Sequence, residues 1–376
     1  MVLVYHSRKS KSWKAGGGLA VALAGGMALN AIGRPVYAQS SGPTVLTNSI
    51  HVNALRLQGY WNPTTKKQDF STTAWLPQIN FRIKGPVSGG SQLSVEFTKP
   101  TGALWYRVDV PTDEIKEDEY SSLHTPRDSD TATEKKYTTG VGLFGFKIRL
   151  KNELTSQNLV LYSGKFKAGK INKANGTAFY KNRAEFYIDH DWELPIGHVY
   201  FYDPGNTVLP PKLSFGTWVK GQAVSPDLAG YLFYKDKQVA STKDQGMGAS
   251  VDATVELNTV GNDKKDPTWK YWEFEWGVIR TNPDPDQTTP YFVMDKNPGA
   301  YTIKVLRNGK LCREAHFSVG DDGNIVDNGI ATNNKIETEG ILLPVKVLGT
   351  TDGTWNKLAW KTDTFYGHPL ISFTAP

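Results

Sequence analysis

A repeated strand pattern constrains this sequence more than any other feature. Residues 142–148 and 299–305 both read Gly-x-aromatic-x-apolar-Lys-β-branched, and each is followed by a charged turn and a run that ends in Phe-x-x-Gly. Successive residues of a strand point to opposite faces of a sheet, so one face of each segment is apolar. We therefore predict two half-buried strands with these inward-facing residues: Phe144, Phe146, Ile148, Tyr301, Ile303 and Val305.

The two segments belong to a longer repeat. An Asx-Pro turn, a Lys-Gly pair, an aromatic strand, the Gly-x-aromatic strand and Phe-x-x-Gly occur in the same order in both halves, and Trp105 is matched with Trp272. Loops accept insertions more readily than strands, so unequal spacing is compatible with duplication. We predict an all-β chain with two tandem antiparallel β-sandwich domains, at residues 45–170 and 185–320.

The first 38 residues have the composition of a signal peptide. Basic residues precede an Ala/Gly/Leu-rich stretch, and Val36-Tyr37-Ala38 fits a small-residue cleavage site. The alternative is an uncleaved membrane anchor, which the five glycines of this stretch disfavour. Residues 39–44 are polar and small, which indicates a flexible N-terminus. No later apolar run has the length of a membrane span.

The charge of the mature chain excludes a basic nucleic-acid-binding character. The leader holds five basic residues and no acid, so the mature chain carries 38 basic and 37 acidic side chains, a net charge of +1. We therefore expect no nucleic-acid partner. Cys312 is the one cysteine, so no intrachain disulfide can form, and its place in an apolar/charged alternation indicates a buried side chain.

The segments outside the two repeats are assigned from their composition. Residues 171–184 are rich in Lys and Asn and are predicted to be an interdomain linker. Residues 321–376 are predicted to be a β-rich extension that packs on the second domain. Its expected strands are residues 341–348, 355–360 and 370–373.

The Gly-x-Tyr-x-Ile-x-Val run, the Asn-Gly-Lys turn and Phe-x-Val-Gly resemble the last two strands of immunoglobulin-like and fibronectin-III-like domains. The resemblance covers about 25 residues of each repeat and concerns architecture alone. It implies that Tyr301 is a corner tyrosine, whose hydroxyl binds the backbone, whereas Phe144 has no hydroxyl to do so. Sandwiches of this type have many unrelated functions.

The motifs that suggest chemistry each have a simpler structural interpretation. Residues 140–145 match G-x-G-x-x-G but run into a strand instead of a helix, so we reject a dinucleotide site. Asp189, His190, Asp191, Glu193 and His198 have the side chains of a metal site, but on a strand His190 would face away from its acidic neighbours, and a solvated strand end is favoured. The acids of residues 321–327 do not have EF-hand spacing and indicate an acidic turn. We expect no metal, no cofactor and no catalytic residue.

Aromatic residues are the best candidates for ligand contacts. Within residues 269–276, Trp272, Phe274 and Trp276 share one strand face and are assigned to the core. Trp269 and Tyr271 share the other face with two glutamates, where exposed aromatics would suit sugar stacking or a protein hot spot. Tyr60 and Trp61 are weighed in the same way, and for both pairs core or interdomain packing is the alternative.

These features predict an exported, non-catalytic interaction or structural protein of the bacterial periplasm or cell surface. A carbohydrate-binding protein that uses its exposed aromatics is the first alternative. An enzyme whose carboxylates come from separate strands is the second, because such a pair leaves no spacing signal. The expected partners are a protein, a second copy of the chain that receives a donated strand such as residues 39–57, or a polysaccharide.

Overall fold

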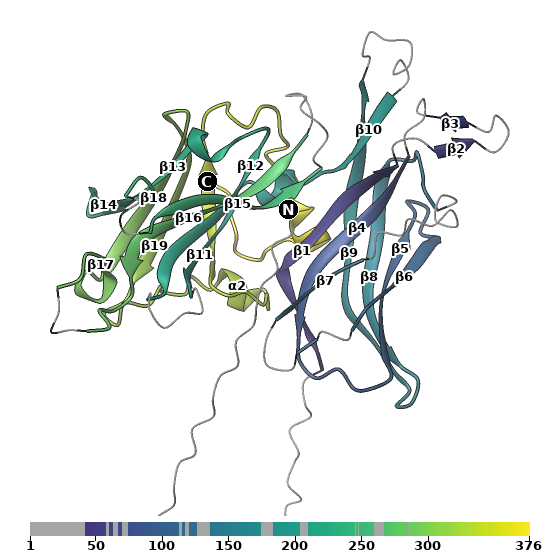
Figure 1. Cartoon of the computed structure of the whole chain (residues 1–376), viewed down its shortest axis with the longest axis horizontal. Coiled ribbons are helices and arrows are strands. Elements are labelled where there is room, and N and C mark those ends of the chain that lie inside the picture. Colours follow the sequence, from purple (N-terminus) through teal and green to yellow (C-terminus); the bar gives the residue numbers. More distant parts are fainter. Residues whose placement is uncertain are drawn as a thin grey trace, which may run out of the picture. The chain divides into compact units, whose positions relative to one another are not determined.

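A computed structural model describes residues 42–57, 60–62, 67–69, 74–112, 115–116, 120–125, 136–173, 183–203, 210–244, 246, 248–258, 267–284, 286 and 288–376. The predicted leader lies outside the described residues. The chain from Ser41 to Pro376 forms one compact unit. It is built of strands in several sheets, with only short helical turns among the described residues, which confirms the all-β prediction (Figure 1).

The first half of this unit contains a three-stranded and a five-stranded sheet. Their orders are β1-β4-β7 and β10-β9-β8-β5-β6, and all neighbours are antiparallel. The strands are β1 (Thr44–Leu57), β4 (Ala74–Lys84), β5 (Ser91–Thr98), β6 (Leu104–Val110), β7 (Ser121–His124), β8 (Gly142–Asn152), β9 (Gln157–Lys173) and β10 (Arg183–Ile188). A separate hairpin is formed by β2 (Tyr60–Asn62) and β3 (Lys67–Asp69).

The second half forms one long sheet, β14-β13-β18-β19-β20-β11-β12-β16-β15, with β17 beside β16. Its strands are β11 (Ile196–Tyr202), β12 (Lys212–Lys220), β13 (Leu228–Tyr234), β14 (Lys237–Ser241), β15 (Ser250–Leu257), β16 (Trp269–Ile279), β17 (Phe292–Val293), β18 (Gly299–Arg307), β19 (Lys310–Val319) and β20 (Ile341–Val347). Strand β20 joins the two parts of this sheet, because residues 341–344 pair with β11 and residues 345–347 pair with β19.

The helical turns are short. They are η2 (Asp191–Glu193), η3 (Ser225–Asp227), η5 (Met294–Lys296), α2 (Ile330–Asn333), η6 (Ala359–Lys361) and α3 (Thr364–Gly367). In the part of the chain that the structure describes, no helix is long and apolar enough to span a membrane.

The predicted inward faces of the strands are confirmed. Phe144, Phe146 and Ile148 lie in the core of the first half, and Tyr301, Ile303 and Val305 lie in that of the second. The second core also contains three further residues that the sequence assigned to it, Trp272, Phe274 and Trp276, together with Cys312. Burial raises the pKa of the Cys312 thiol to about 11, so this cysteine is a small buried side chain, as predicted.

The C-terminal segment differs from the prediction. Residues 341–347 do form a strand, but the regions expected to form two more contain η6, α3 and turns. Phe365, Tyr366, Leu370 and Phe373 join the core of the first half instead of packing on the second half alone. These side chains follow no period-2 alternation, and their apolar rings are buried by an irregular backbone.

The structure also corrects three local predictions. Residues 171–173 belong to β9 and residues 183–184 to β10, so both ends of the predicted linker are paired strand; residues 174–182 lie outside the described part. Strand β1, considered for donation to a second copy, pairs with β4 of its own chain. Trp105 lies on β6 at the edge of a five-stranded sheet, whereas Trp272 lies on β16 beside β12, so the two do not occupy matching strands.

Candidate functional site

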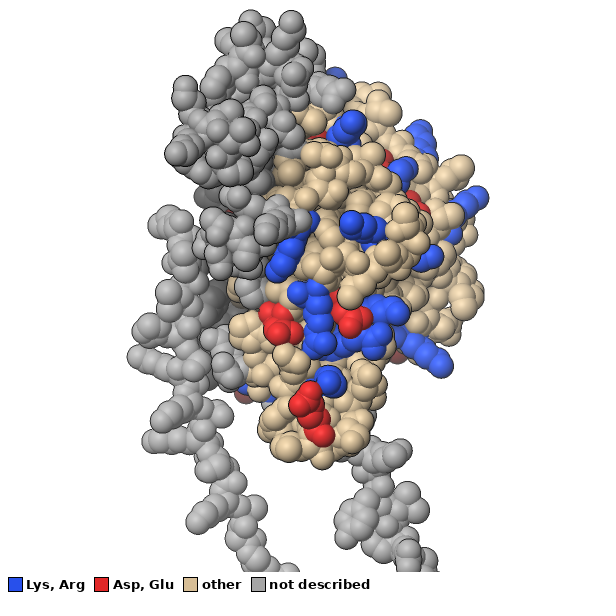
Figure 2. Space-filling model, turned by 90° about the vertical axis from the view of Figure 1, so that its right-hand side faces the viewer, with Lys and Arg blue, Asp and Glu red and all other residues tan. Residues whose placement is uncertain are grey.

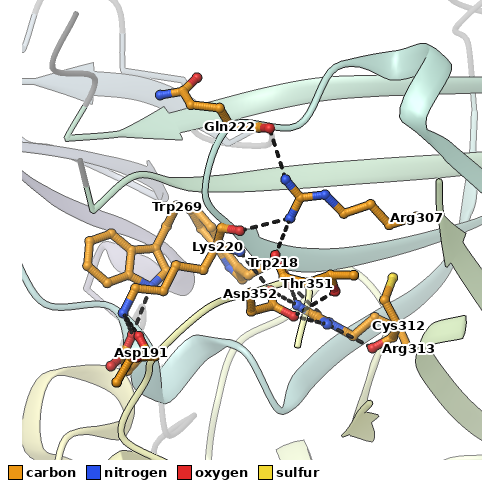
Figure 3. A network of polar contacts seen from close by, with 11 residues as sticks. Asp191, Trp218, Lys220, Gln222, Trp269, Arg307, Cys312, Arg313, Thr351 and Asp352 are labelled. Atoms are coloured by element: carbon orange, nitrogen blue, oxygen red, sulfur yellow. Dashed lines mark hydrogen bonds and ion pairs between the residues drawn. The ribbon is translucent and has the colours of Figure 1, made fainter. Parts of the chain in front are cut away.

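Trp269 does not form an exposed aromatic surface. Its side chain is fully buried, and its indole Nε1 donates a 3.2 Å hydrogen bond to Oδ1 of Asp191 on η2. The ammonium of Lys220 lies 4.7 Å from the centroid of the ring (Figure 3). The prediction of a solvent-facing stacking residue is therefore wrong at this position, because Asp191 of η2 and the side chain of Lys220 lie against the Trp269 ring.

The polar network around Trp269 is a structural anchor. Arg313 is buried and makes two hydrogen bonds with Asp352, of which the Nη1–Oδ2 distance is 2.7 Å. Burial alone would raise the pKa of Asp352, but the ion pair with Arg313 holds it below its usual value. Arg307 donates to the carbonyls of Lys220, Gln222 and Thr351 (Figure 3). These bonds fix the loop after β20 to the end of β12.

Two predicted aromatic contacts cannot be placed. The backbone of Tyr60 and Trp61 forms part of β2, but their side chains lie outside the described part of the chain.

Tyr271, the fourth predicted residue, lines a cavity of about 320 Å³. The cavity wall comes from β1, β4, β11, β12, β15, β16, β20, η2 and α3 and from the segment before β20. It includes Leu46, Asn48, His51, Arg82, Trp192, Glu193, His198, Tyr200, Trp218, Tyr271, Glu273, Glu339 and Phe365. A cavity of this size that combines aromatic walls with convergent polar groups is the usual form of a small-molecule site.

His198 and Glu273 of the cavity wall lie in one row across the sheet, with Gly216 between them. His198 on β11 is opposite Gly216 on β12, and Gly216 is opposite Glu273 on β16. A Cβ atom at position 216 would lie 1.6 Å from the Tyr271 hydroxyl oxygen, so only glycine leaves room for this phenol. The Tyr271 ring thus occupies the space above Gly216 and extends across β12 toward His198.

His198 is a neutral hydrogen-bonding group in this wall. Its Nε2 lies 2.8 Å from Oγ1 of Thr338, and its Nδ1 lies 3.5 Å from the hydroxyl of Tyr271. The amide Nδ2 of Asn48 lies 3.1 Å from Nε2. Burial lowers the pKa of His198 to about 4, with Glu339 opposing the shift, so the imidazole is uncharged at pH 7.

Glu273 is a carboxyl group of the cavity wall with a tyrosine hydroxyl as hydrogen-bond donor. The hydroxyl of Tyr200 donates a 2.6 Å hydrogen bond to its Oε1. Burial is the main cause that raises the pKa of Glu273, and Asp252 and Glu339 raise it further, against the effect of the Tyr200 bond. This carboxyl group therefore holds a proton more strongly than a solvated glutamate.

Glu339 has the opposite environment. Both of its carboxylate oxygens accept hydrogen bonds from the guanidinium of Arg82, at 2.8 and 2.9 Å. A bidentate pair of this kind fixes the orientation of the carboxylate. Glu273 and Glu339, two of the three glutamates of the cavity wall, thus come from different elements and have different hydrogen-bond partners.

The residues weighed as metal ligands separate in the structure. His190 Nδ1 lies 2.8 Å from Oε1 of Glu193, and its Nε2 lies 2.9 Å from the carbonyl of Val52. Asp191 accepts from Lys220 and from the backbone of Asn356. No group of three or more His, Cys, Asp or Glu side chains among the described residues has the arrangement of a metal site. Since residues 191–193 form a 3₁₀ turn, the strand geometry expected there is wrong.

Basic side chains gather on the outer face of the five-stranded sheet of the first half. Figure 2 looks at the side on which β5, β6 and β8 lie in Figure 1, and it shows Lys and Arg side chains with a few acidic ones among them. Arg149 is paired with Glu96 at 2.6 Å, and Lys151 with Glu153 at 2.9 Å. Charges of both signs on an open sheet are typical of a solvated face, so the enclosed cavity is the better candidate site.

Sequence reasoning identified part of this cavity. Tyr271 was predicted as a ligand contact, and Glu273 was noted as its neighbour on the same strand face. His198 was weighed only as a metal ligand, while Tyr200, Asn48 and His51 were missed. The sequence feature that could have indicated them is the spacing of His198 and Tyr200, which lie two residues apart and so on one face of β11.

Comparisons with protein-family models, with curated proteins and with solved structures find no match to the chain. The geometry of the cavity is therefore the basis for a functional assignment.

Proposed function

We propose that this chain is an exported, non-catalytic binding protein that holds a sugar-sized polar ligand in the cavity between β1, β11 and β16. The observation that carries the proposal is the composition of the cavity wall. Trp218 and Tyr271, with ring centroids 5.4 Å apart, offer apolar ring surface, and Asn48, His198 and Glu273 offer donors and acceptors. Sugars present both apolar ring faces and hydroxyl groups, so they match this combination. Export rests on the leader-like residues 1–38.

The proposed architecture is a tandem pair of immunoglobulin-like domains that arose by duplication. The sheet order supports it: β10-β9-β8-β5-β6 in the first half is paralleled by β20-β19-β18-β13-β14 in the second, and β1-β4-β7 by β11-β12-β16. Two ring pairs support it as well. Phe144 stacks on Phe166 at 5.8 Å between centroids, and Tyr301 stacks on Phe317 at 5.3 Å, in each case as opposed residues of adjacent strands.

Two backbone details support the same architecture. Gly142 and Gly299 begin the matched strands with φ values of 125° and 128°, which L-residues rarely adopt. The hydroxyl of Tyr301 donates a 2.6 Å hydrogen bond to the carbonyl of Asn297, four residues upstream, as a corner tyrosine does. Domain limits near residues 45–170 and 185–320 remain part of this proposal.

Calorimetric titration of the full-length mature chain with a panel of mono- and disaccharides tests the proposed binding. We expect saturable binding of at least one sugar. Gly216→Ala, which displaces the Tyr271 phenol, is expected to weaken that binding about tenfold or more, equivalent to about 1.4 kcal/mol. Gly89→Ala is the matched control, because a Cβ at position 89 meets no atom within 4 Å. If the folded protein binds none of the sugars, the proposal is wrong.

A second candidate function is glycoside hydrolysis by carboxylates from separate elements. Glu273 and Glu339 line the same cavity; burial and neighbouring acids raise the pKa of Glu273, whereas the Glu339 carboxylate forms a bidentate pair with Arg82. Such a difference suits a general acid and its partner carboxylate. Release of reducing ends from an oligosaccharide by the wild-type chain, abolished in Glu273→Gln, would favour this function over binding alone.

A further inference from the structure

Two further acidic side chains, Asp252 and Glu275, lie beside Glu273 of the cavity wall. Glu273 on β16 is directly opposite Asp252 on β15, and Glu275 lies two residues along on the same face of β16. Burial is the main cause that raises the pKa of Glu275; Lys212 opposes the shift, and Glu273 and Asp252 add to it. The same neighbours act on Glu273, where Glu339 contributes too. These carboxylates repel one another, so a positive charge placed among them would be attracted.

The protein supplies little positive charge to this cavity. Arg82 is the one Lys or Arg among the described residues that line it. Its Nη1 and Nη2 atoms already donate hydrogen bonds to the Glu339 carboxylate. The histidines of the wall are neutral at pH 7. Burial lowers the pKa of His51 to about 3, with a contribution from His190, and that of His198 to about 4. The negative potential beside Glu273 is therefore not balanced from within the cavity.

Aromatic rings stand close to these acids. Tyr200 bonds to Glu273 directly, and Tyr271, two residues before Glu273, packs at 5.4 Å from the centroid of Trp218. The faces of such rings attract cations, most strongly when the cation loses water on binding. Aromatic rings beside carboxylates are the arrangement that recognises an ammonium group.

The cavity wall also has unused hydrogen-bonding capacity. Asn48 and His51, both on β1, each carry a buried polar atom, Oδ1 and Nδ1, with no hydrogen-bond partner among the described residues. Both lie where the pairing of β1 with β4 shifts register, between Leu46 and His51. An amide oxygen can only accept, so Asn48 fits a ligand that donates N–H or O–H groups.

We propose that the ligand is an amino sugar, with its ring against Tyr271 and Trp218 and its protonated amine beside Glu273. This inference rests on the proposed sugar-binding function and narrows its ligand class. An amino sugar meets each requirement: a ring face for the aromatic residues, hydroxyl and N–H donors for the acceptor groups, and one positive charge for the carboxylates.

A matched set of three ligands tests the inference. Glucosamine, glucose and N-acetylglucosamine share one ring, and only glucosamine is cationic at pH 7. We expect calorimetry on the full-length chain to give an association constant for glucosamine about tenfold or more above those for the other two. High salt should reduce this preference, because the attraction is electrostatic.

Glu273→Gln provides the matching variant, since the amide oxygen can still accept from Tyr200 while the charge is lost. The ratio of glucosamine to glucose association constants should fall close to one. Glu153→Gln, which removes an exposed acid paired with Lys151 outside the cavity wall, should leave the ratio unchanged.

The possible outcomes separate the two proposals. A preference for glucosamine that Glu273→Gln removes supports both. Equal binding of all three sugars, or a preference that survives in Glu273→Gln, overturns the amino-sugar inference and leaves sugar binding in place. Failure of all three to bind, while another sugar of the panel binds, also overturns only the inference. If no sugar binds, both proposals fall.

Discussion

The hydroxyl of Tyr200 donates a 2.6 Å hydrogen bond to Oε1 of Glu273 across an intervening strand. The two residues lie on β11 and β16, and β12 runs between them. Long side chains can meet over a central strand only where that strand presents small residues. Ser214 and Gly216 of β12 are the residues opposite Tyr200 and Glu273. The small side chains of β12 thus allow a polar contact to form over a sheet that is otherwise well packed.

Glu273→Gln is expected to make stability less dependent on pH. Because burial and neighbouring acids raise the pKa of Glu273 in the folded chain, the folded state holds this proton more tightly than the unfolded chain does. Ionisation of Glu273 therefore destabilises the fold, and the loss develops as the pH rises from the ordinary glutamate range through the raised pKa. Urea unfolding at pH 5 and pH 8 should show a gain in unfolding free energy for the variant that is larger at pH 8.

Glu153→Gln is the control for this measurement. The carboxylate of Glu153 is exposed, and its hydrogen bond with Lys151 lowers its pKa, so its removal should give no stability gain at pH 8. A Glu273→Gln gain that is equal at both pH values would contradict the assignment of a raised pKa.

Asp352→Asn is expected to be strongly destabilising. It leaves Arg313, a fully buried guanidinium, without its counter-charge, and breaking a buried ion pair typically costs about 3–5 kcal/mol. The double variant Arg313→Met/Asp352→Leu removes both charges. Its loss of unfolding free energy should be much smaller than the sum of the losses in Arg313→Met and Asp352→Leu. Guanidinium unfolding of the wild type, Arg313→Met, Asp352→Leu and the double variant measures the coupling, and additive losses would show that the pair is not a unit.

The same pair predicts a dependence on acid. Arg313 holds the pKa of Asp352 below its usual value in spite of burial, so the carboxylate stabilises the fold at every pH above the ordinary carboxyl range. This contribution is lost as the pH falls through the lowered pKa. The stability difference between wild type and Asp352→Asn should accordingly shrink in strong acid.

Tyr366→Phe is expected to loosen the C-terminal segment from β1. The Tyr366 hydroxyl accepts from the backbone N–H of Val52 at 2.8 Å and donates to the carbonyl of Ile50 at 3.1 Å. Both backbone groups are buried, and leaving them unpaired typically costs about 1–3 kcal/mol. Tyr187→Phe is the control, because its hydroxyl makes no hydrogen bond with the described residues. Equal stability of the two variants would mean that the two bonds contribute nothing.

Gly142→Ala and Gly299→Ala are expected to be destabilising by similar amounts. A Cβ atom would have room at both positions, 3.5 Å from Pro100 and 3.7 Å from Tyr234, so the loss comes from the backbone angle rather than from a clash. Forcing an L-residue into such a region costs roughly 1–3 kcal/mol. Gly89→Ala is the control, because its φ lies outside the left-handed region and a Cβ there meets no atom within 4 Å. A large loss at only one of the two sites would argue against the duplication.

The sequence predicts the strands better than the site. The alternation of side chains along a strand correctly places Trp272, Phe274 and Trp276 on one face of β16. It places Trp269 and Tyr271 on the other face, because this period of two does not depend on what surrounds the strand. It does not show what covers the second face. At Trp269 that cover is η2, and around Tyr271 it is β1, which is more than 200 residues away in sequence.

The residues around His198 show the same limit. Asn48, Thr338 and Tyr271 reach it from distances of 150, 140 and 73 positions along the chain. No spacing rule joins residues so far apart, so their types suggest polar chemistry but not a common site. The C-terminal aromatics are a further case, because Phe365 and Tyr366 have positive φ and follow no periodic pattern.

The place of β20 has a consequence for how the chain matures. Strand β20 completes the sheet between β11 and β19, and Tyr366 binds β1 near the start of the chain. Both contacts come from the last tenth of the sequence. A polypeptide in which residues 341–347 are missing or not yet made therefore keeps the edges of β11 and β19 open, and such edges are targets for aggregation and proteolysis.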